Sequence, residues 1–120
     1  MAPLEGIRVL DFTRVVAGPL ATRILADQGA EVIKVEPPEG DLSRTFPPLL
    51  QNEITPYFAQ QNAGKLFCSF NLSHDETPQL VAELAAQCDV IVENFRPGVM
   101  AKYGLDYESL SKENPRLVYC

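Results

Sequence analysis

Residues 7–27 constrain the fold of this chain more than any other stretch of its 120 residues. Residues 7–12 are rich in β-branched and bulky apolar side chains, and they predict a buried strand. Residues 13–18 predict a tight loop, and Pro19 suits the first turn of a helix that runs to about Gln28. A strand that passes through a short loop into a helix directs backbone N–H groups toward an anion above the strand's end.

The rest of the chain continues this alternation of strand and helix. Further strands are predicted at residues 31–36, 66–70, 89–93 and 117–120. Helices are predicted at residues 57–61, from a Ser73–Glu76 capping box through Gln87, from Pro97 to Gly104, and at residues 107–113 with Asp106 as the cap. Compact strand–helix–strand units require parallel strands. We therefore predict an α/β fold, a parallel sheet with flanking helices.

The predicted elements form one domain over residues 1–120, in which the last strand is cut in its middle. We therefore expect the leading part of a longer protein. Residues 37–56 form a long irregular excursion, of the kind that is usually functional or covers a partner. Its Asp41 and Arg44 are candidates for the edge of a site, although solvated turn residues are the more common alternative.

Charge and hydropathy exclude several classes of function. The net charge of −6 argues against broad nucleic-acid binding, which needs a basic face. The sequence contains no apolar run that could span a bilayer, and its first residues lack the basic and apolar regions of a secretion signal. We expect a protein of the cytoplasm, with mitochondria and peroxisomes as alternatives, and no contact with a membrane.

A metal site is not expected. The three cysteines, Cys68, Cys88 and Cys120, are widely spaced, and His74 is the single histidine. No pair has the spacing of metal ligands or of a redox motif. Cys68 and Cys88 stand in apolar runs, so buried thiols are the expected interpretation.

Three loops that follow strands should meet at one edge of the parallel sheet: residues 13–18, 37–41 and 94–98. A ligand at that edge would contact backbone N–H groups and five side chains that bind anions or stack on bases. These are Arg14, Arg96, Lys102, Phe70 and Phe95. Guanidinium groups suit phosphate, and an aromatic ring beside a cation suits a purine. The sequence thus predicts a ligand that carries a nucleotide.

The common nucleotide motifs are absent from the sequence. Glu36 ends the second strand, where an acid could take a ribose hydroxyl of NAD. However, the loop before the first helix contains Gly18 alone rather than G-x-G-x-x-G, and no P-loop motif occurs. A serine elbow or a Cys/His pair is likewise absent, and Asp11 in the first strand can simply bind loop amides. We assign no catalytic residue.

Three segments carry a resemblance to a known family: PLEGIRVLDFTRVVAGPLATRILADQGAEVIKVEPPEGD, NAGK, and DVIVENFRPGVMAKYGLDYESLSKENPRLVY. They resemble the family III CoA-transferases of the CaiB/BaiF type, a group with formyl-CoA and carnitine CoA-transferases and α-methylacyl-CoA racemases. The two most specific pieces are LDFTRVVAGP and VENFRPGV. The resemblance covers nearly the whole chain in order.

This resemblance implies the N-terminal part of a Rossmann-like, CoA-binding large domain, in subunits that form an interlocked homodimer. CoA or acyl-CoA would bind as a substrate along the strand-end loops, with no permanently bound cofactor. The implied CoA-binding residues are Arg14, Val16, Ala17, Phe70, Asn71, Leu72, Ser73, Asn94, Phe95, Arg96 and Lys102. Some relatives have a basic residue where this chain has Pro37, and Ala63 and Leu66 replace charge that the NAGK segment has elsewhere.

The resemblance also implies where the chemistry lies. In the transferases an aspartate carboxylate forms an anhydride with the acyl group and then a CoA thioester, and that residue lies downstream of Cys120. The expected function is transfer of CoA between an acyl-CoA thioester and a free carboxylic acid, because TRVVAGP and KVEPPEGD are closer to the transferases. A racemase and a non-catalytic CoA-binding fragment are the alternatives.

Overall fold

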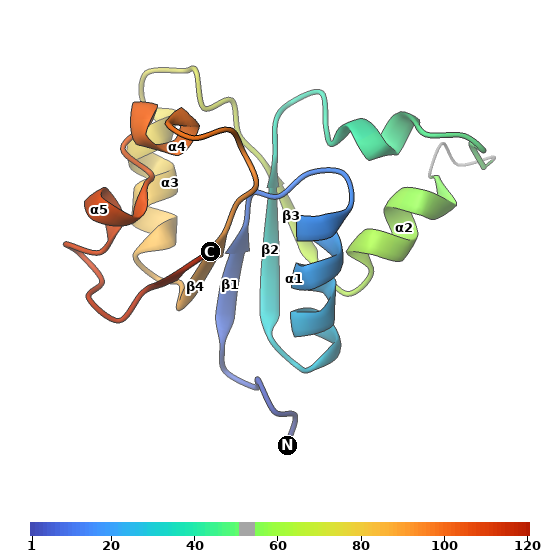
Figure 1. Cartoon of the computed structure of the whole chain (residues 1–120), viewed down its shortest axis with the longest axis horizontal. Coiled ribbons are helices and arrows are strands. Elements are labelled where there is room, and N and C mark those ends of the chain that lie inside the picture. Colours follow the sequence, from blue (N-terminus) through green and yellow to red (C-terminus); the bar gives the residue numbers. More distant parts are fainter. Residues whose placement is uncertain (51–54) are drawn as a thin grey trace.

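The structure is a computed structural model, which describes residues 1–50 and 55–120 (Figure 1). Five strands form one sheet: β1 (Arg8–Asp11), β2 (Glu31–Glu36), β3 (Leu66–Ser69), β4 (Val90–Val92) and β5 (Val118–Tyr119). The helices are α1 (Ala17–Asp27), the 3-10 helix η1 (Leu42–Thr45), α2 (Pro56–Asn62), α3 (Thr77–Ala85), α4 (Val99–Lys102) and α5 (Tyr107–Leu110). The predicted α/β fold is confirmed.

The strands follow the order β3-β2-β1-β4-β5, and every neighbouring pair is parallel. Val9 of β1 aligns with Val32 of β2 on one side and with Val90 of β4 on the other. This is the order of the first five strands of a Rossmann sheet. In that order β2 and β3 are added on one side of β1, and β4 and β5 on the other, so the strand order reverses beside β1. Ligands bind in such sheets at the carboxyl ends of the strands, next to that reversal.

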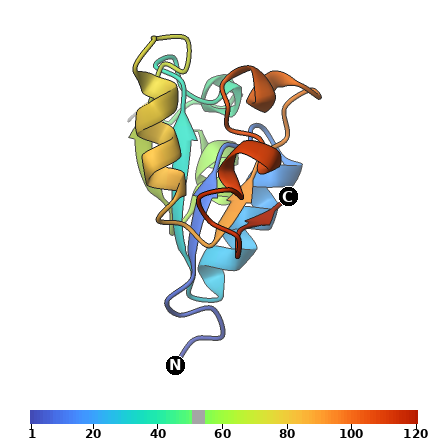
Figure 2. The ribbon, with the colours of Figure 1, turned by 90° about the vertical axis from the view of Figure 1, so that its left-hand side faces the viewer.

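Alternate strand residues point to opposite faces of the sheet, and the two faces differ in chemistry. Figures 1 and 2 show α3, α4 and α5 on one face and α1 and α2 on the other. The α3 face carries the larger apolar cluster, which includes Leu10, Phe12, Val35, Val81, Ile91, Met100, Leu105 and Leu110. The α1 face carries a small cluster of Val9, Ala30, Val32 and Val92.

Several element boundaries differ from the prediction. Helix α1 begins at Ala17, so Pro19 is its third residue rather than its first. The capping box does not form, because the Ser73 N–H binds the Asn71 side chain in a turn, and α3 begins only at Thr77. Pro78 explains that start, since a proline near the first helical position lacks only an N–H that would have no partner.

The helices of the second half are shorter than predicted. Helix α3 ends at Ala85 rather than Gln87, and α5 ends at Leu110 rather than Glu113. Asp106 occupies the N-cap position of α5, but its side chain makes no capping hydrogen bond. Helix α2 extends one residue beyond the prediction at each end, and the Thr55 hydroxyl caps it by accepting the Phe58 N–H at 2.9 Å.

The predicted excursion at residues 37–56 contains the 3-10 helix η1, and its residues 51–54 lie outside the described residues. Cys88 is buried, Cys68 is half-buried and Cys120 is exposed. In the described part of the chain, no three His, Cys, Asp or Glu side chains gather as a metal site would require. The described helices also include none with the length and apolar character needed to cross a membrane.

Candidate functional site

A cavity of about 630 Å³ opens at the carboxyl edge of the sheet. Residues that follow β1, β2, β3 and β4 line it together with α4, so the predicted meeting of strand-end loops is confirmed. Its lining combines one guanidinium from Arg14 with the aromatic rings of Phe12, Phe70, Phe95 and Tyr103. Its volume falls within the range of small-molecule sites.

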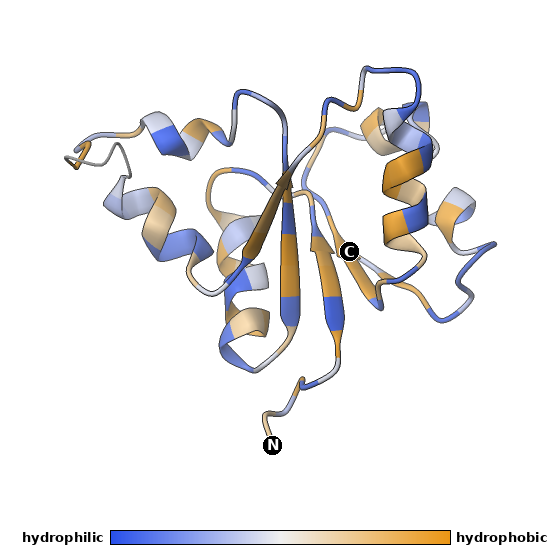
Figure 3. Ribbon diagram, turned by 180° about the vertical axis from the view of Figure 1, so that it is seen from behind, coloured by the Kyte–Doolittle hydropathy of each residue, from blue (hydrophilic) through white to orange (hydrophobic). Residues whose placement is uncertain are grey.

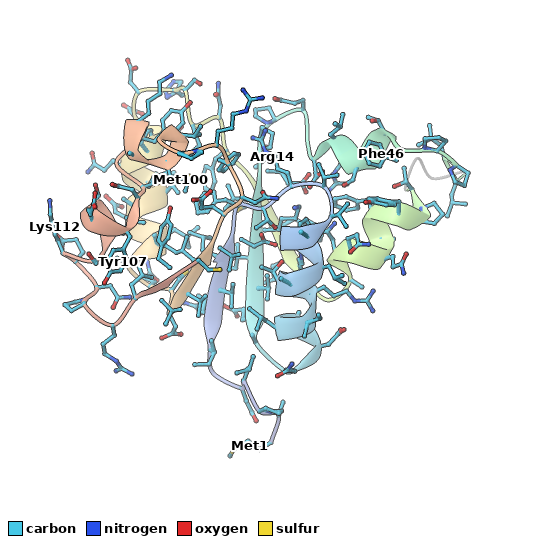
Figure 4. The ribbon with its side chains drawn as sticks, viewed as in Figure 1. Met1, Arg14, Phe46, Met100, Tyr107 and Lys112 are labelled. Carbon is cyan, nitrogen blue, oxygen red and sulfur yellow. The ribbon has the colours of Figure 1, made fainter. Side chains whose placement is uncertain are left out.

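Arg14 stands over the ring of Phe95, with its guanidinium carbon 4.7 Å from the ring centroid. Figure 4 shows Arg14 at the ends of the central strands. The Asn94 side chain joins the two loops, since its Oδ1 accepts the Arg14 N–H at 2.9 Å and its Nδ2 donates to the Arg14 carbonyl at 3.0 Å. The loop after β1 is therefore attached to the loop after β4 through both backbone groups of Arg14.

Val15 has a φ of 69°, and it is the one non-glycine residue of the described chain with a positive φ. A β-branched residue rarely adopts this left-handed conformation. It costs about 1–3 kcal/mol and persists only where surrounding contacts hold it. The Asp41 carboxylate provides such a contact, because its two oxygens lie 3.2 and 3.3 Å from the Val15 backbone nitrogen and accept its N–H.

Asp41 and Lys34 form a buried ion pair beneath this loop. Lys34 Nζ lies 3.0 Å from Asp41 Oδ2, with the two side chains at most 1% exposed, and donates to the Thr13 carbonyl at 2.7 Å. Burial by itself would raise the pKa of Asp41. Hydrogen bonds from Ser43 and the charge of Lys34 outweigh burial, so the pKa lies below its usual value. Asp41 is consequently a buried anion rather than a solvated turn residue.

A second buried ion pair joins Asp11 to Lys65, whose Nζ lies 2.9 Å from Asp11 Oδ2. The Lys65 ammonium also donates to the Pro19 carbonyl and to Asn62 Oδ1, each at 2.9 Å, and Asp11 accepts the Thr22 hydroxyl at 2.6 Å. Burial lowers the pKa of Lys65, and the attraction of Asp11 opposes that change. The pair ties β1 to α1 and to the turn before β3.

A third pair stands at the end of β2. Arg44 donates to both oxygens of Glu36, at 2.8 Å from Nε and 2.6 Å from Nη2, and its guanidinium carbon lies 3.8 Å from the centroid of the Phe58 ring. Burial would raise the pKa of Glu36, but hydrogen bonds from Arg44 and from the Asp41 N–H lower it overall. Glu36 is thus a pairing residue, which leaves it unsuited to a ribose contact.

The structure gathers about half of the predicted CoA-binding residues around the cavity. Those that line it are Arg14, Phe70, Asn71, Leu72, Ser73 and Phe95. Val16 precedes α1 as its N-cap and Ala17 is the first residue of that helix; both are exposed but neither lines the cavity. Asn94 binds the loop that carries Arg14.

Arg96 and Lys102 also do not line the cavity. Arg96 lines a separate hollow with Glu93 and Tyr119, and Lys102 places its ammonium 5.6 Å from the centroid of the Tyr103 ring.

The sequence-based prediction missed two groups of residues. Val99 and Tyr103 line the cavity from α4 and just beyond it, and their spacing of four on a helical segment could have indicated a shared face. The buried lysines Lys34 and Lys65 were also missed. Lys34 lies on the same face of β2 as the buried Val32, but a shared face does not by itself identify a buried lysine.

Comparison with known proteins adds to this geometry. The profile of CoA-transferase family III matches residues 4–120. The chain is 48% identical over 121 residues to the succinyl-CoA:glutarate CoA-transferase of Mus musculus, a match that covers 100% of this chain and 28% of that protein. It is 44% identical over 123 residues to the succinyl-CoA:mesaconate CoA-transferase of Haloarcula marismortui, which covers 99% of this chain and 31% of that protein.

A solved structure agrees with these sequence matches. The crystal structure of a CaiB/BaiF family protein from Brucella suis superposes with a TM-score of 0.93 at 45% identity, covering 99% of this chain and 32% of that one. The chain thus spans a little under a third of the length of the relatives it matches. The family profile and the solved structure each match nearly the whole length of this chain, and the chain belongs to CoA-transferase family III.

Proposed function

We propose that this chain supplies part of the CoA site of an enzyme that moves CoA between an acyl-CoA thioester and a free carboxylic acid. The observation that carries the proposal is the cavity at the carboxyl edge, in which Arg14 stands over Phe95. The names of the relatives support the reaction class, because the mouse and Haloarcula proteins are both named as transferases of CoA from succinyl-CoA to another acid.

The lining of the cavity fits the parts of a CoA molecule. A guanidinium such as that of Arg14 can donate two parallel hydrogen bonds to a phosphate. The rings of Phe70 and Phe95 offer faces on which an adenine can stack, and the segment from Phe70 to Ser73 closes the same side. Leu72 and Val99 supply apolar surface for the remainder of the molecule.

The carboxylates at this edge support a binding role rather than a reacting one. Asp11 and Asp41 are buried in ion pairs with Lys65 and Lys34, and neither lines the cavity. Glu36 and Glu39 do line it. Both oxygens of Glu36 accept hydrogen bonds from Arg44, and Glu39 is exposed in the loop after β2. The carboxylate that takes up the acyl group is the one that the resemblance to the family III transferases places downstream of Cys120, and its position stays part of this proposal.

The test uses the protein of natural length that contains this chain. It is incubated with succinyl-CoA and with ¹³C-labelled glutarate, mesaconate or oxalate, and the thioesters are followed by mass spectrometry. We expect label to appear in a new acyl-CoA while free succinate accumulates in equal amount. Failure to exchange CoA between any of these pairs would contradict the proposal. Deuterium uptake beside the thioester without exchange would select the racemase alternative instead.

Two further expectations accompany this function. The interlocked homodimer stays a prediction, which light scattering on the natural-length protein checks. The cytoplasmic location also stays a prediction, and cell fractionation with an antibody against the chain checks it.

A further inference from the structure

The ion pair of Lys34 and Asp41 presents a question that the proposed function does not answer. Neither side chain lines the cavity, and burying two charges is costly unless their contacts compensate for it. Lys34 also occupies the middle of a strand whose neighbouring residues on that face could all be apolar, as Val32 is. The contacts of the pair with the loop after β1 indicate what it does.

Three consecutive residues of that loop are each held by a side chain from another segment. Lys34 from β2 donates to the Thr13 carbonyl, and Asn94 from the loop after β4 binds both backbone groups of Arg14. Asp41, which caps η1, accepts the N–H of Val15. The loop is therefore fixed from both sides at Val15, the one non-glycine residue of the described chain with a positive φ.

The left-handed residue sets the direction of the chain. Val15 turns the backbone between Arg14, which lines the cavity, and α1, which covers the opposite face of the sheet. A valine released from its hydrogen bond with Asp41 would return to a negative φ, because its branched side chain disfavours the left-handed region. That rotation would move the neighbouring Arg14 backbone away from Asn94 and its guanidinium away from Phe95.

We propose that Asp41, together with Lys34, is a positioning residue that holds the loop of residues 13–15 so that Arg14 stands over Phe95 in the cavity. The proposal rests on the proposed function, because the ligand it serves is CoA. Pairing Asp41 with Lys34 also keeps the pair neutral, so that the loop is held by a carboxylate without adding net negative charge near the phosphates of the ligand.

The experiment compares four forms of the natural-length protein: wild type, Asp41→Asn, Arg14→Ala and the double variant. Isothermal titration measures the Kd for CoA, and hydrogen–deuterium exchange follows the segment that contains Val15. We expect each single variant to weaken CoA binding about tenfold. The double variant should be no weaker than Arg14→Ala alone, because Asp41 acts through Arg14. Exchange at Val15 should rise at least tenfold in Asp41→Asn.

Two further variants separate positioning from a general loss of stability. Val15→Gly keeps the N–H that Asp41 accepts and removes the cost of the positive φ, so we expect the Kd for CoA and the exchange at residues 13–17 to stay close to those of wild type. Leu110→Ala removes a buried side chain of α5, on the face of the sheet opposite the Lys34–Asp41 pair and outside the lining of the cavity, and should leave the Kd unchanged in the folded protein.

The outcomes are distinct. Losses that multiply to about a hundredfold in the double variant, or an unchanged exchange rate at Val15 in Asp41→Asn, would overturn the proposal. An equal loss of affinity in Leu110→Ala would overturn it as well, since destabilisation alone would then explain the effect. Wild-type protein that binds no CoA would contradict the proposed function, while the exchange measurement would still decide whether Asp41 holds the loop.

Discussion

The two faces of the sheet are built from alternate residues of the same strands, yet they are held together by different forces. The α3 face packs Leu10, Ile91 and Met100 in one apolar cluster. The α1 face, toward the carboxyl ends of the strands, instead buries Asp11 and Lys34 with their partners. Figure 3 shows the strands of the sheet as mainly hydrophobic, with hydrophilic bands among them.

This difference separates stability from orientation. Apolar contacts are not directional, so the α3 face can stabilise the sheet without fixing any one loop. Hydrogen bonds and ion pairs have defined geometry, and a buried polar group that loses its partner is costly. The α1 face, which carries the charges, can thus hold the loop before α1 in one conformation. Arg14 of that loop lines the cavity, which opens across the α3 face.

The largest effect is expected from breaking a pair on the charged face. Lys65→Met leaves Asp11 buried without its counter-charge, which should lower the free energy of unfolding by about 3–5 kcal/mol. Urea unfolding followed by circular dichroism measures this. Asp27→Asn is the control, because it removes an exposed i,i+4 pair with Arg23 and should cost only about 0.3–0.5 kcal/mol. Equal losses in the two variants would erase the distinction between buried and exposed pairs.

A somewhat smaller loss is expected from the apolar face. Leu110→Ala deletes a side chain that is 6% exposed, and it should lower the free energy of unfolding by about 2–5 kcal/mol in the same urea experiment. Because the lost apolar contacts are not directional, hydrogen exchange at residues 13–15 should rise only as much as the loss of global stability requires. A selective rise in exchange at that loop would show that the two faces do not have separate roles.

The smallest effect concerns pH. The pKa of Glu36 is lower in the folded protein than its ordinary value of about 4.5, so the stability it contributes is complete above that pH. That stability is lost as the pH falls through the folded pKa, by up to about 1.4 kcal/mol per pH unit for each proton. Between pH 7 and pH 3, the free energy of unfolding should fall less steeply in Glu36→Gln than in wild type. Identical slopes would contradict the pairing of Glu36 with Arg44.

The strands and their parallel arrangement could be predicted because they depend on local sequence patterns. Apolar periodicity located every strand to within one or two residues, and the geometry of parallel strands brought Arg14 and Phe95 together from positions far apart in the chain. Boundaries such as the start of α3 were wrong because Pro78 and the Asn71 turn outweighed a capping pattern that was equally local.

The charged face could not be predicted in the same way. A lysine in an alternating strand usually faces solvent, and what buries Lys34 is Asp41, which comes from an irregular segment without periodicity. The partner of Asp11 is Lys65, 54 positions along the chain, and the sequence contains no pattern that joins them. Arg96 lines a hollow separate from the cavity, since composition identifies a cation in a loop but not the side to which it points.

The most direct test of this account is a crystal structure of the natural-length protein with CoA bound. We expect the adenosine part to lie in the cavity between the Phe70–Ser73 segment and Phe95, with a phosphate oxygen within hydrogen-bonding distance of the Arg14 guanidinium. Val15 should keep its positive φ and its hydrogen bond to Asp41. CoA bound elsewhere, or bound here with the Arg14 side chain turned to solvent, would contradict it.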